Sequence, residues 1–174
     1  QSTHVIDRYH FIRQVHWALE NVRKREQKRM TATERKWFKR SRSLLKKPAK
    51  DLTEAEKGLV ATMLEKSDAI RTAYILKEGF YTYVLSRNDK ETAATALSKW
   101  MEEAKNSGQK EWRYCLRAYK NWFEEITNSF DYPWSNGYVE GTHNKIKTVK
   151  RVAFGMQNFH HFRTKLLFVC SKDR

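Results

Sequence analysis

The sequence predicts a mainly α-helical protein, and three observations support this prediction. Apolar residues recur at helical spacing along most of the 174-residue chain. Six glycines and two prolines are too few for a sandwich or barrel that needs many turns. The single segment that favours a strand, residues 3–6, is short and lies at the start of the chain. We therefore expect helices throughout, with one short N-terminal strand.

The expected helices follow one another with few interruptions. Residues 8–30 carry apolar side chains at helical spacing and basic side chains on the opposite face. Residues 41–52 are expected to form a basic connector, which Pro48 interrupts. Residues 109–128 give the clearest pattern, an aromatic-rich stripe typical of one long core-facing helix. The expected helix caps are Thr31 or Thr33, Thr53 with Glu56 in a capping box, Ser67 and Asp89.

The net charge of +15 is concentrated in two segments of the chain. Residues 21–50 hold 13 basic and 2 acidic side chains, and residues 141–174 hold 8 basic and 1 acidic side chain. The residues between them, 51–140, are mildly acidic. Two basic segments beside an ordinary core indicate a surface that binds a polyanion such as nucleic acid. The alternative interpretation is a solvated helix face.

Composition also excludes several classes of protein. Two cysteines are too few for a disulfide framework or a zinc cluster, and they fit a reducing cytoplasm. No run of about 18 apolar residues occurs, so we expect no membrane-spanning segment. The chain does not begin with Met, and we expect it to be a piece of a longer protein.

The segment with the most distinctive chemistry lies near the C-terminus. Residues 135–151 read Ser-Asn-Gly-Tyr-Val-Glu-Gly-Thr-His-Asn-Lys-Ile-Lys-Thr-Val-Lys-Arg. Glu140 and Asn144 lie four residues apart, and Lys147 and Arg151 continue close to the same helix face. A carboxylate followed by basic groups along one line can hold a metal ion and pair with phosphates. The alternative is an ordinary surface helix on which Glu140 is salt-bridged.

This segment resembles the C-terminal signature of bacterial insertion-sequence transposases of the ISL-three family. That signature has Ser-Asn-Gly, Glu-Gly, Asn-x-Ile-Lys and Lys-Arg, then an aromatic-Gly pair and Asn-Phe. The chain continues in the same way, with Phe-Gly at 154–155 and Asn-Phe at 158–159. Near the other end, Asp7 to His10 resembles the family's Asp-x-aromatic-His segment at the end of a strand. His143 departs from the pattern, because the family commonly has Asn there.

The resemblance implies the C-terminal part of the catalytic region of a DDE-type transposase, with a ribonuclease-H-like domain and three acidic metal ligands. Asp7 matches the second ligand and Glu140 the third, while the first Asp would lie upstream of this chain. His10 is a candidate for orienting Asp7 or a phosphate, and its alternative role is structural. The implied domains are the end of a catalytic strand and its helix in 1–30, a helical insertion in 31–130, and C-terminal catalytic helices with the Glu motif in 131–174.

The implied reaction is metal-dependent DNA cleavage and strand transfer of an insertion sequence. Two Mg²⁺ ions would neutralise charge on the attacking and leaving oxygens, and hard oxygen ligands suit this ion. Water attacks first and frees a 3′ hydroxyl, which then attacks the target DNA. Because one ligand is missing, we expect this chain alone to be inactive and not to hold the two ions.

The basic segments are expected to hold the DNA backbone, mostly without reading sequence. Trp37 and Trp134 are candidates for stacking on unpaired bases, with core packing as the alternative. The implied partners are the element ends, the target DNA, the missing N-terminal part of the protein and further copies of it, as a homodimer or larger assembly on DNA. The implied location is the bacterial cytoplasm, at the nucleoid. The candidate DNA-binding residues are Arg23, Lys24, Arg25, Lys28, Arg29, Arg35, Lys36, Lys39, Arg40, Asn144, Lys145, Lys147, Lys150 and Arg151.

Two other classes of function remain open at this point. A non-enzymatic helical nucleic-acid-binding module explains the basic segments, but it gives no reason for Glu140 among basic residues. A helical adaptor for acidic proteins predicts a shallow salt dependence of DNA binding. A true DNA-binding surface instead loses about 0.9 in log affinity per phosphate contact for each tenfold increase in salt.

Overall fold

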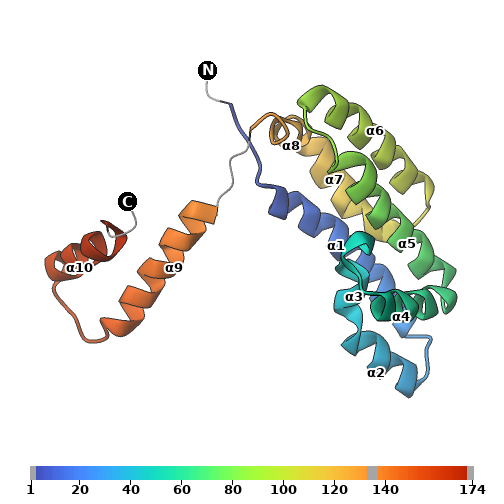
Figure 1. Ribbon diagram of the computed structural model, residues 1–174, viewed down its shortest axis with the longest axis horizontal. Coiled ribbons are helices and arrows are strands. Elements are labelled where there is room, and N and C mark those ends of the chain that lie inside the picture. The colour runs from blue at the N-terminus through green and yellow to red at the C-terminus, as the bar shows by residue number, and fades with distance from the viewer. Residues whose placement is uncertain (1–2, 133–136, 172–174) are drawn as a thin grey trace. The chain divides into compact units, whose positions relative to one another are not determined.

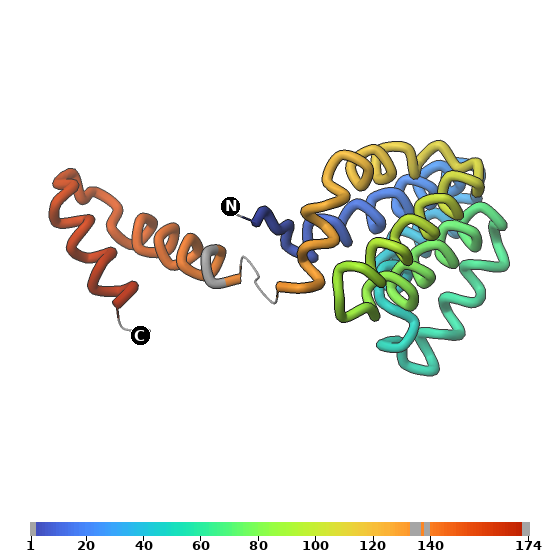
Figure 2. Tube along the Cα trace, turned by 90° about the horizontal axis from the view of Figure 1, so that it is seen from above, coloured from blue at the N-terminus to red at the C-terminus, as the bar shows by residue number. Residues whose placement is uncertain are grey.

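The computed structural model of the chain describes residues 3–132 and 137–171. It contains two units, Gln1–Pro133 and Trp134–Arg174, and each is helical (Figure 1, Figure 2). Every regular element among the described residues is a helix or a helical turn, which confirms the prediction of a mainly α-helical chain. Trp134, a candidate for base stacking, lies outside the described residues.

In the first unit, α1 (Arg8–Gln27) packs against α5 (Asp68–Gly79) and α7 (Arg113–Asn121) (Figure 1). All the residues from Arg8 to Phe130 that are buried and apolar belong to one core cluster. The predicted segments 1–30 and 31–130 therefore share one core. The other elements of this unit are α2 (Ala32–Arg40), α3 (Arg42–Lys46), η1 (Ala49–Asp51), α4 (Glu54–Glu65), η2 (Phe80–Val84), α6 (Lys90–Asn106), η3 (Lys110–Trp112) and α8 (Phe123–Asn128).

Four of the helices begin at residues with the predicted capping chemistry. Thr31, rather than Thr33, caps α2, and Thr53 caps α4; each forms a capping box with a glutamate at the third helical position. Ser67 caps α5 and Asp89 caps α6, each accepting a hydrogen bond from a backbone N–H of the first turn. These side chains satisfy backbone donors that would otherwise have no partner at a helix start.

The expected connector, residues 41–52, contains the short helix α3 and the turn η1. Leu45 is buried in the core, so this stretch gains from being helical despite its basic composition. Lys77 of α5 is also buried. It pairs with Glu78 and donates a hydrogen bond to the carbonyl oxygen of Lys47 (2.8 Å), which fixes the connector to α5. Burial lowers the pKa of Lys77 from its usual value, against the opposing effect of Glu78.

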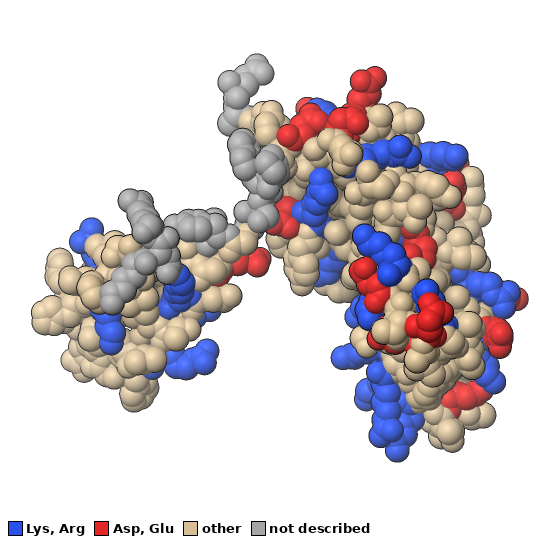
Figure 3. All heavy atoms as spheres, viewed as in Figure 1, with Lys and Arg blue, Asp and Glu red and all other residues tan. Residues whose placement is uncertain are grey.

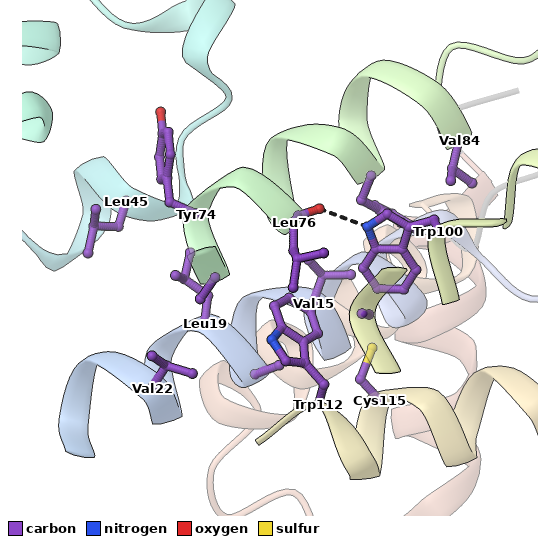
Figure 4. Close-up of a cluster of buried hydrophobic side chains, with 14 of the residues drawn as sticks. Val15, Leu19, Val22, Leu45, Tyr74, Leu76, Val84, Trp100, Trp112 and Cys115 are labelled. Carbon is purple, nitrogen blue, oxygen red and sulfur yellow. Dashed lines mark hydrogen bonds between the residues drawn. The ribbon is translucent and has the colours of Figure 1, made fainter. Parts of the chain in front are cut away.

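Large aromatic side chains are buried in the core, and Figure 4 shows Trp100 and Trp112 among aliphatic neighbours. Trp100 is buried and donates from its indole N–H to the carbonyl oxygen of Leu76 (2.8 Å). Tyr119 donates from its hydroxyl to the carbonyl oxygen of Phe11 (2.7 Å). Buried aromatic residues with a polar tip need such partners, and here the partners tie α6 to α5 and α7 to α1.

The long helix expected over residues 109–128 is divided into η3, α7 and α8. The break lies at Trp122, whose backbone (φ −119°, ψ 27°) leaves the helical range. Trp112, Cys115 and Tyr119 are buried as the stripe predicts, but Trp122 is 52% exposed. The change of direction at the break therefore turns Trp122 out of the core.

Residues 3–6 form no regular secondary structure. The backbone N–H of Ile6 donates to the carbonyl oxygen of Glu125 (3.1 Å), and the Asn128 side chain donates to the carbonyl oxygen of His4 (2.9 Å). A strand needs a neighbouring strand for its hydrogen-bond ladder, and the described residues contain none. The N-terminal strand stays a prediction.

The second unit is a hairpin of two helices, α9 (Gly137–Val152) and α10 (Phe159–Ser171). Gly155 lies in the turn between them with φ +86°, a conformation that favours glycine. Val149 is buried, and no residue of α10 is. Among the described side chains of this unit, the exposed large apolar ones are Val152, Phe154, Met156, Phe159, Leu167 and Phe168.

Candidate catalytic residues and nucleic-acid interface

Asp7 lies at the start of α1, where it is the N-cap residue. Its Oδ1 accepts a hydrogen bond from the backbone N–H of Tyr9 (2.8 Å). An N-cap carboxylate satisfies a backbone N–H donor that would otherwise have no partner at the helix start. The half-buried His10 follows one turn later, and its backbone N–H donates to the carbonyl oxygen of Asp7 (3.0 Å). The His10 ring lies edge-on to Tyr9, with 5.7 Å between the ring centroids.

Glu140 lies in the first turn of α9 and is exposed. Asn144, Lys147 and Arg151 follow it at intervals of four, three and four residues, and all three are exposed. Because α-helical neighbours are three and four residues apart, these side chains line one side of α9. The predicted line of a carboxylate followed by an amide and two cations is therefore present on the helix surface.

The two candidate metal ligands belong to different units, Asp7 to the first and Glu140 to the second. Among residues 3–132 and 137–171, no three His, Cys, Asp or Glu side chains are grouped so that they could hold a metal ion. Each carboxylate nevertheless lies at the start of a helix and offers the hard oxygen ligands that Mg²⁺ prefers. The donor chemistry of each fits this ion.

Arg23 and Arg25, two of the candidate DNA-binding residues, are engaged inside the first unit. Arg23 is buried and forms two hydrogen bonds with the Glu20 carboxylate (2.8 and 2.9 Å) as well as one with Gln27. Arg25 is half-buried and pairs with Glu26 and Glu111. The charge of Arg23 is thus neutralised within the fold, so Arg23 does not belong to the exposed basic surface.

Burial itself raises the pKa of Glu20, but the hydrogen bonds and charge of Arg23 outweigh it. The net result is a pKa of Glu20 below its usual value. A charged arginine in this position therefore stabilises the ionised glutamate, which is a structural role.

The other candidate DNA-binding cations of residues 21–50 are exposed, and four of them lie on α2. Arg35, Lys36, Lys39 and Arg40 occupy neighbouring positions on one face of this helix, which we call the α2 basic face. Phe38 lies on the buried side of α2. The Glu34 carboxylate forms an ion pair with Lys66 (3.2 Å). Figure 3 shows Lys and Arg side chains gathered at the end of the unit where α2 lies. The remaining exposed candidates of this segment are Lys24, Lys28 and Arg29.

In the second unit, Lys145, Lys147, Lys150 and Arg151 are all exposed on α9. They surround Asn144 and follow Glu140, so this helix presents a mainly basic surface with one carboxylate at its start. Trp37, the described stacking candidate, is half-buried and packs edge-on against Phe38, with 5.1 Å between the ring centroids. The contact with Phe38 matches the core-packing alternative.

One set of exposed aromatic residues was not expected from the sequence. Trp17, Tyr114 and Trp122 line a groove between α1 and the α7–α8 segment. Their exposed fractions are 49%, 71% and 52%. Trp122 lies in the apolar stripe of residues 109–128, which predicts its burial, whereas Trp17 lies outside the apolar stripe of residues 8–30. The helix break at Trp122 is the feature that exposes one of them.

These observations define a helical protein with basic surfaces and a carboxylate set among cations. The chain belongs to the ISL-three family of transposases, because the model of this family, described as Transposase, matches residues 1–166. The match includes both Asp7 and Glu140.

Individual relatives agree with this assignment in most cases. The chain is 25% identical to the transposase for insertion sequence element IS1001 of Bordetella parapertussis over 76% of the chain and 32% of the relative. It is 28% identical to the transposase for element IS1557 of Mycobacterium tuberculosis (strain CDC 1551 / Oshkosh), over 70% and 27%. A Lactococcus lactis protein named ATP-dependent protease is 27% identical over 70% and 37%. The chain thus spans about a third of the length of these relatives. No solved structure matches it.

None of the described helices combines the length and the apolar character needed to cross a membrane.

Proposed function

We propose that this chain is a piece of a DDE-type DNA transposase that cleaves and joins DNA with divalent metal ions. The observation that supports this most strongly is the family match over residues 1–166, together with Glu140 at the start of an exposed, basic helix face. The test is whether the longer protein that contains this chain cleaves DNA carrying the ends of the insertion sequence.

In this proposal Asp7 and Glu140 are metal ligands in a ribonuclease-H-like catalytic domain. Bound Mg²⁺ ions would supply charge neutralisation at the phosphate and activation of water. The chain's own contribution is to present both carboxylate side chains at helix starts. A third acidic ligand would come from outside this chain, so we expect the isolated 174 residues not to cleave DNA. Metal-dependent nicking by the purified chain would contradict this.

The exposed cations are proposed to hold the DNA backbone in two places. The α2 basic face presents four cations on one helix side, and α9 presents Lys147, Lys150 and Arg151 beside Glu140. Such contacts set position and affinity rather than sequence preference. We further propose that the complete protein acts as a homodimer or larger assembly on DNA.

Removing charge from the α2 basic face will weaken DNA binding and its salt dependence. The double variant Lys36→Ala with Lys39→Ala should lower the slope of log affinity against log salt by up to about 1.8, because each lost duplex phosphate contact removes about 0.9. Fluorescence anisotropy with duplex DNA between about 50 and 200 mM salt measures this slope. The matched control is Lys99→Ala with Lys105→Ala on α6, where both lysines are exposed and the charge change is the same. Equal slopes for the two double variants would remove the α2 basic face from the proposal.

Gly141, next to Glu140, is expected to matter for cleavage and not for folding. A Cβ at this position would meet no atom within 4 Å, so packing inside the chain does not require glycine. Gly141→Ala should stabilise α9 by about 0.5–1 kcal/mol. It should lower cleavage by the longer protein about 10- to 100-fold, if DNA approaches the backbone here and is displaced.

Gly58 on α4 provides the matched control for this variant. It is also a helical glycine with open space around its Cβ position. Gly58→Ala should give a similar gain in helix stability with unchanged cleavage. Full cleavage by the Gly141→Ala protein would show that no substrate approaches this turn of α9.

A further inference from the structure

The groove between α1 and the α7–α8 segment has a volume of about 620 Å³, within the range of ligand-binding sites. On α1 it is lined by Gln14, Trp17, Asn21 and Lys24, which succeed one another at helical intervals. On the other side it is lined by Tyr114, Arg117, Asn121 and Trp122. Each helix therefore contributes one continuous stripe of aromatic, amide and basic side chains to the groove.

Small residues form the floor between these two stripes. Ala18 and Cys115 are buried, and Ala118 is partly buried. Because these side chains are short, the facing helices leave open space between the larger aromatic residues. Burial also raises the pKa of the Cys115 thiol, so the floor is uncharged.

Two of the three exposed aromatic rings, those of Trp17 and Tyr114, have a cation stacked on them. The Arg13 guanidinium carbon lies 4.6 Å from the centroid of the Trp17 ring, and the Arg117 guanidinium carbon lies 5.2 Å from that of Tyr114. Arg13 also has the one buried side-chain N–H, at Nε, for which the described residues provide no hydrogen-bond partner. Guanidinium groups beside exposed rings can contact phosphates while the rings stack on bases.

The electrostatic surroundings favour a polyanion in this groove. A second pocket shares Asn21, Glu111, Tyr114 and Arg117 with it and adds Lys110 and Arg113. The one carboxylate of both linings, Glu111, accepts hydrogen bonds from Arg25 at 2.7 and 2.8 Å and is therefore compensated. Four cations remain for a bound chain of phosphates: Lys24, Lys110, Arg113 and Arg117.

We propose that this groove binds unpaired nucleotides of a DNA strand, with Trp17, Tyr114 and Trp122 stacking on bases. This inference rests on the proposed function, and it adds a single-strand site to the duplex-binding surface on α2. Bases in a duplex have their faces covered by neighbouring bases, whereas unpaired bases offer both faces to aromatic rings. Such stacking tolerates any base, and the groove's amides can meet base edges.

The test compares binding of the purified chain to a single-stranded oligonucleotide and to the duplex of the same sequence. Trp17→Ala, Tyr114→Ala and Trp122→Ala should each weaken single-strand binding by roughly 5- to 100-fold, the effect of losing one base–aromatic stack. Duplex binding should change less than about twofold, because duplex phosphates contact other surfaces. Trp17→Phe should retain most of the single-strand affinity. Arg117→Ala should lower the salt slope of single-strand binding by about 0.7, the value for one phosphate contact.

Tyr83→Ala is the matched control, because Tyr83 is 57% exposed but lies outside this groove. A second measurement uses the wild-type chain alone: photo-crosslinking to a strand that carries 5-iododeoxyuridine should label peptides containing Trp17, Tyr114 or Trp122. If crosslinks lie elsewhere and the three alanine variants bind single strands normally, while duplex binding persists, the groove inference is wrong and the DNA-binding proposal stands. If the chain binds neither DNA form, the proposed function fails as well.

Discussion

Arg23→Ala will destabilise the first unit by about 3–5 kcal/mol, the usual cost of removing one member of a buried ion pair. The Arg23 and Glu20 side chains are only 4% and 10% exposed, and they share two hydrogen bonds at 2.8 and 2.9 Å. Without Arg23 the Glu20 carboxylate is left buried with no cation hydrogen-bonded to it. Chemical denaturation of the wild-type and variant chains measures the difference in free energy of unfolding.

The pH dependence of this loss of stability in the Arg23→Ala chain gives a second measurement of the ion pair. In the wild type the pKa of Glu20 is lowered, so its contribution is present above the ordinary glutamate pKa and is lost as pH falls. In the variant, burial without Arg23 should raise that pKa above its ordinary value. The sign then reverses, and part of the lost stability should return as pH falls through this raised pKa of Glu20.

Lys24→Ala is the control, because Lys24 is the exposed neighbour of Arg23 on the same helix. Its free energy of unfolding should stay within about 0.5 kcal/mol of wild type, as for most surface substitutions. The DNA affinity of the Lys24→Ala protein should fall, because Lys24 is exposed. The DNA affinity of folded Arg23→Ala protein should stay unchanged, because Arg23 is buried. An Arg23→Ala chain as stable as wild type would show that the buried pair contributes little.

Glu140→Gln will leave DNA binding intact and reduce cleavage by the longer protein at least about 100-fold. A metal ion supplies several kcal/mol of transition-state stabilisation, and glutamine removes the charge that holds it while keeping the side chain's size. Glu140 is exposed in the first turn of α9, so the substitution should not disturb packing. Gel-shift and cleavage assays on the same DNA separate binding from chemistry.

Glu91→Gln is the matched control for this variant. Glu91 is likewise an exposed glutamate in the first turn of a helix, here α6, so both substitutions remove the same charge–dipole interaction. Cleavage by Glu91→Gln protein should equal wild type. If Glu140→Gln protein also cleaves normally, Glu140 is a surface residue. If wild type binds DNA but never cleaves it, the non-enzymatic binding module becomes the better account.

Local signals predicted much of the fold. Capping side chains at Thr53, Ser67 and Asp89 define helix starts because their hydrogen bonds involve residues only a few positions away. The break at Trp122 was not predicted, since a stripe of apolar residues does not reveal a single non-helical backbone position. The helix within residues 41–52 was missed for a similar reason: the burial of Leu45 depends on tertiary packing, which overrides a basic, Pro-containing sequence.

The sequence likewise predicted some features of the candidate site and missed others. Helical spacing correctly places Glu140, Asn144, Lys147 and Arg151 along one side of α9. Composition could not distinguish Arg23, which is buried against Glu20, from the exposed cations near it. The groove at Trp17 and Trp122 needed the positions of two helices that are far apart in sequence. Whether Asp7 and Glu140 act on one phosphate stays a prediction.

The most direct test is the metal dependence of DNA cleavage by the wild-type protein in its longer form. A labelled DNA carrying one end of the insertion sequence is incubated with the protein and Mg²⁺, or with EDTA. We expect cleavage only with Mg²⁺ and a product with a free 3′ hydroxyl, which a polymerase can extend. Equal cleavage in EDTA, or binding with no cleavage under either condition, would contradict the assignment of this chain to a metal-dependent transposase.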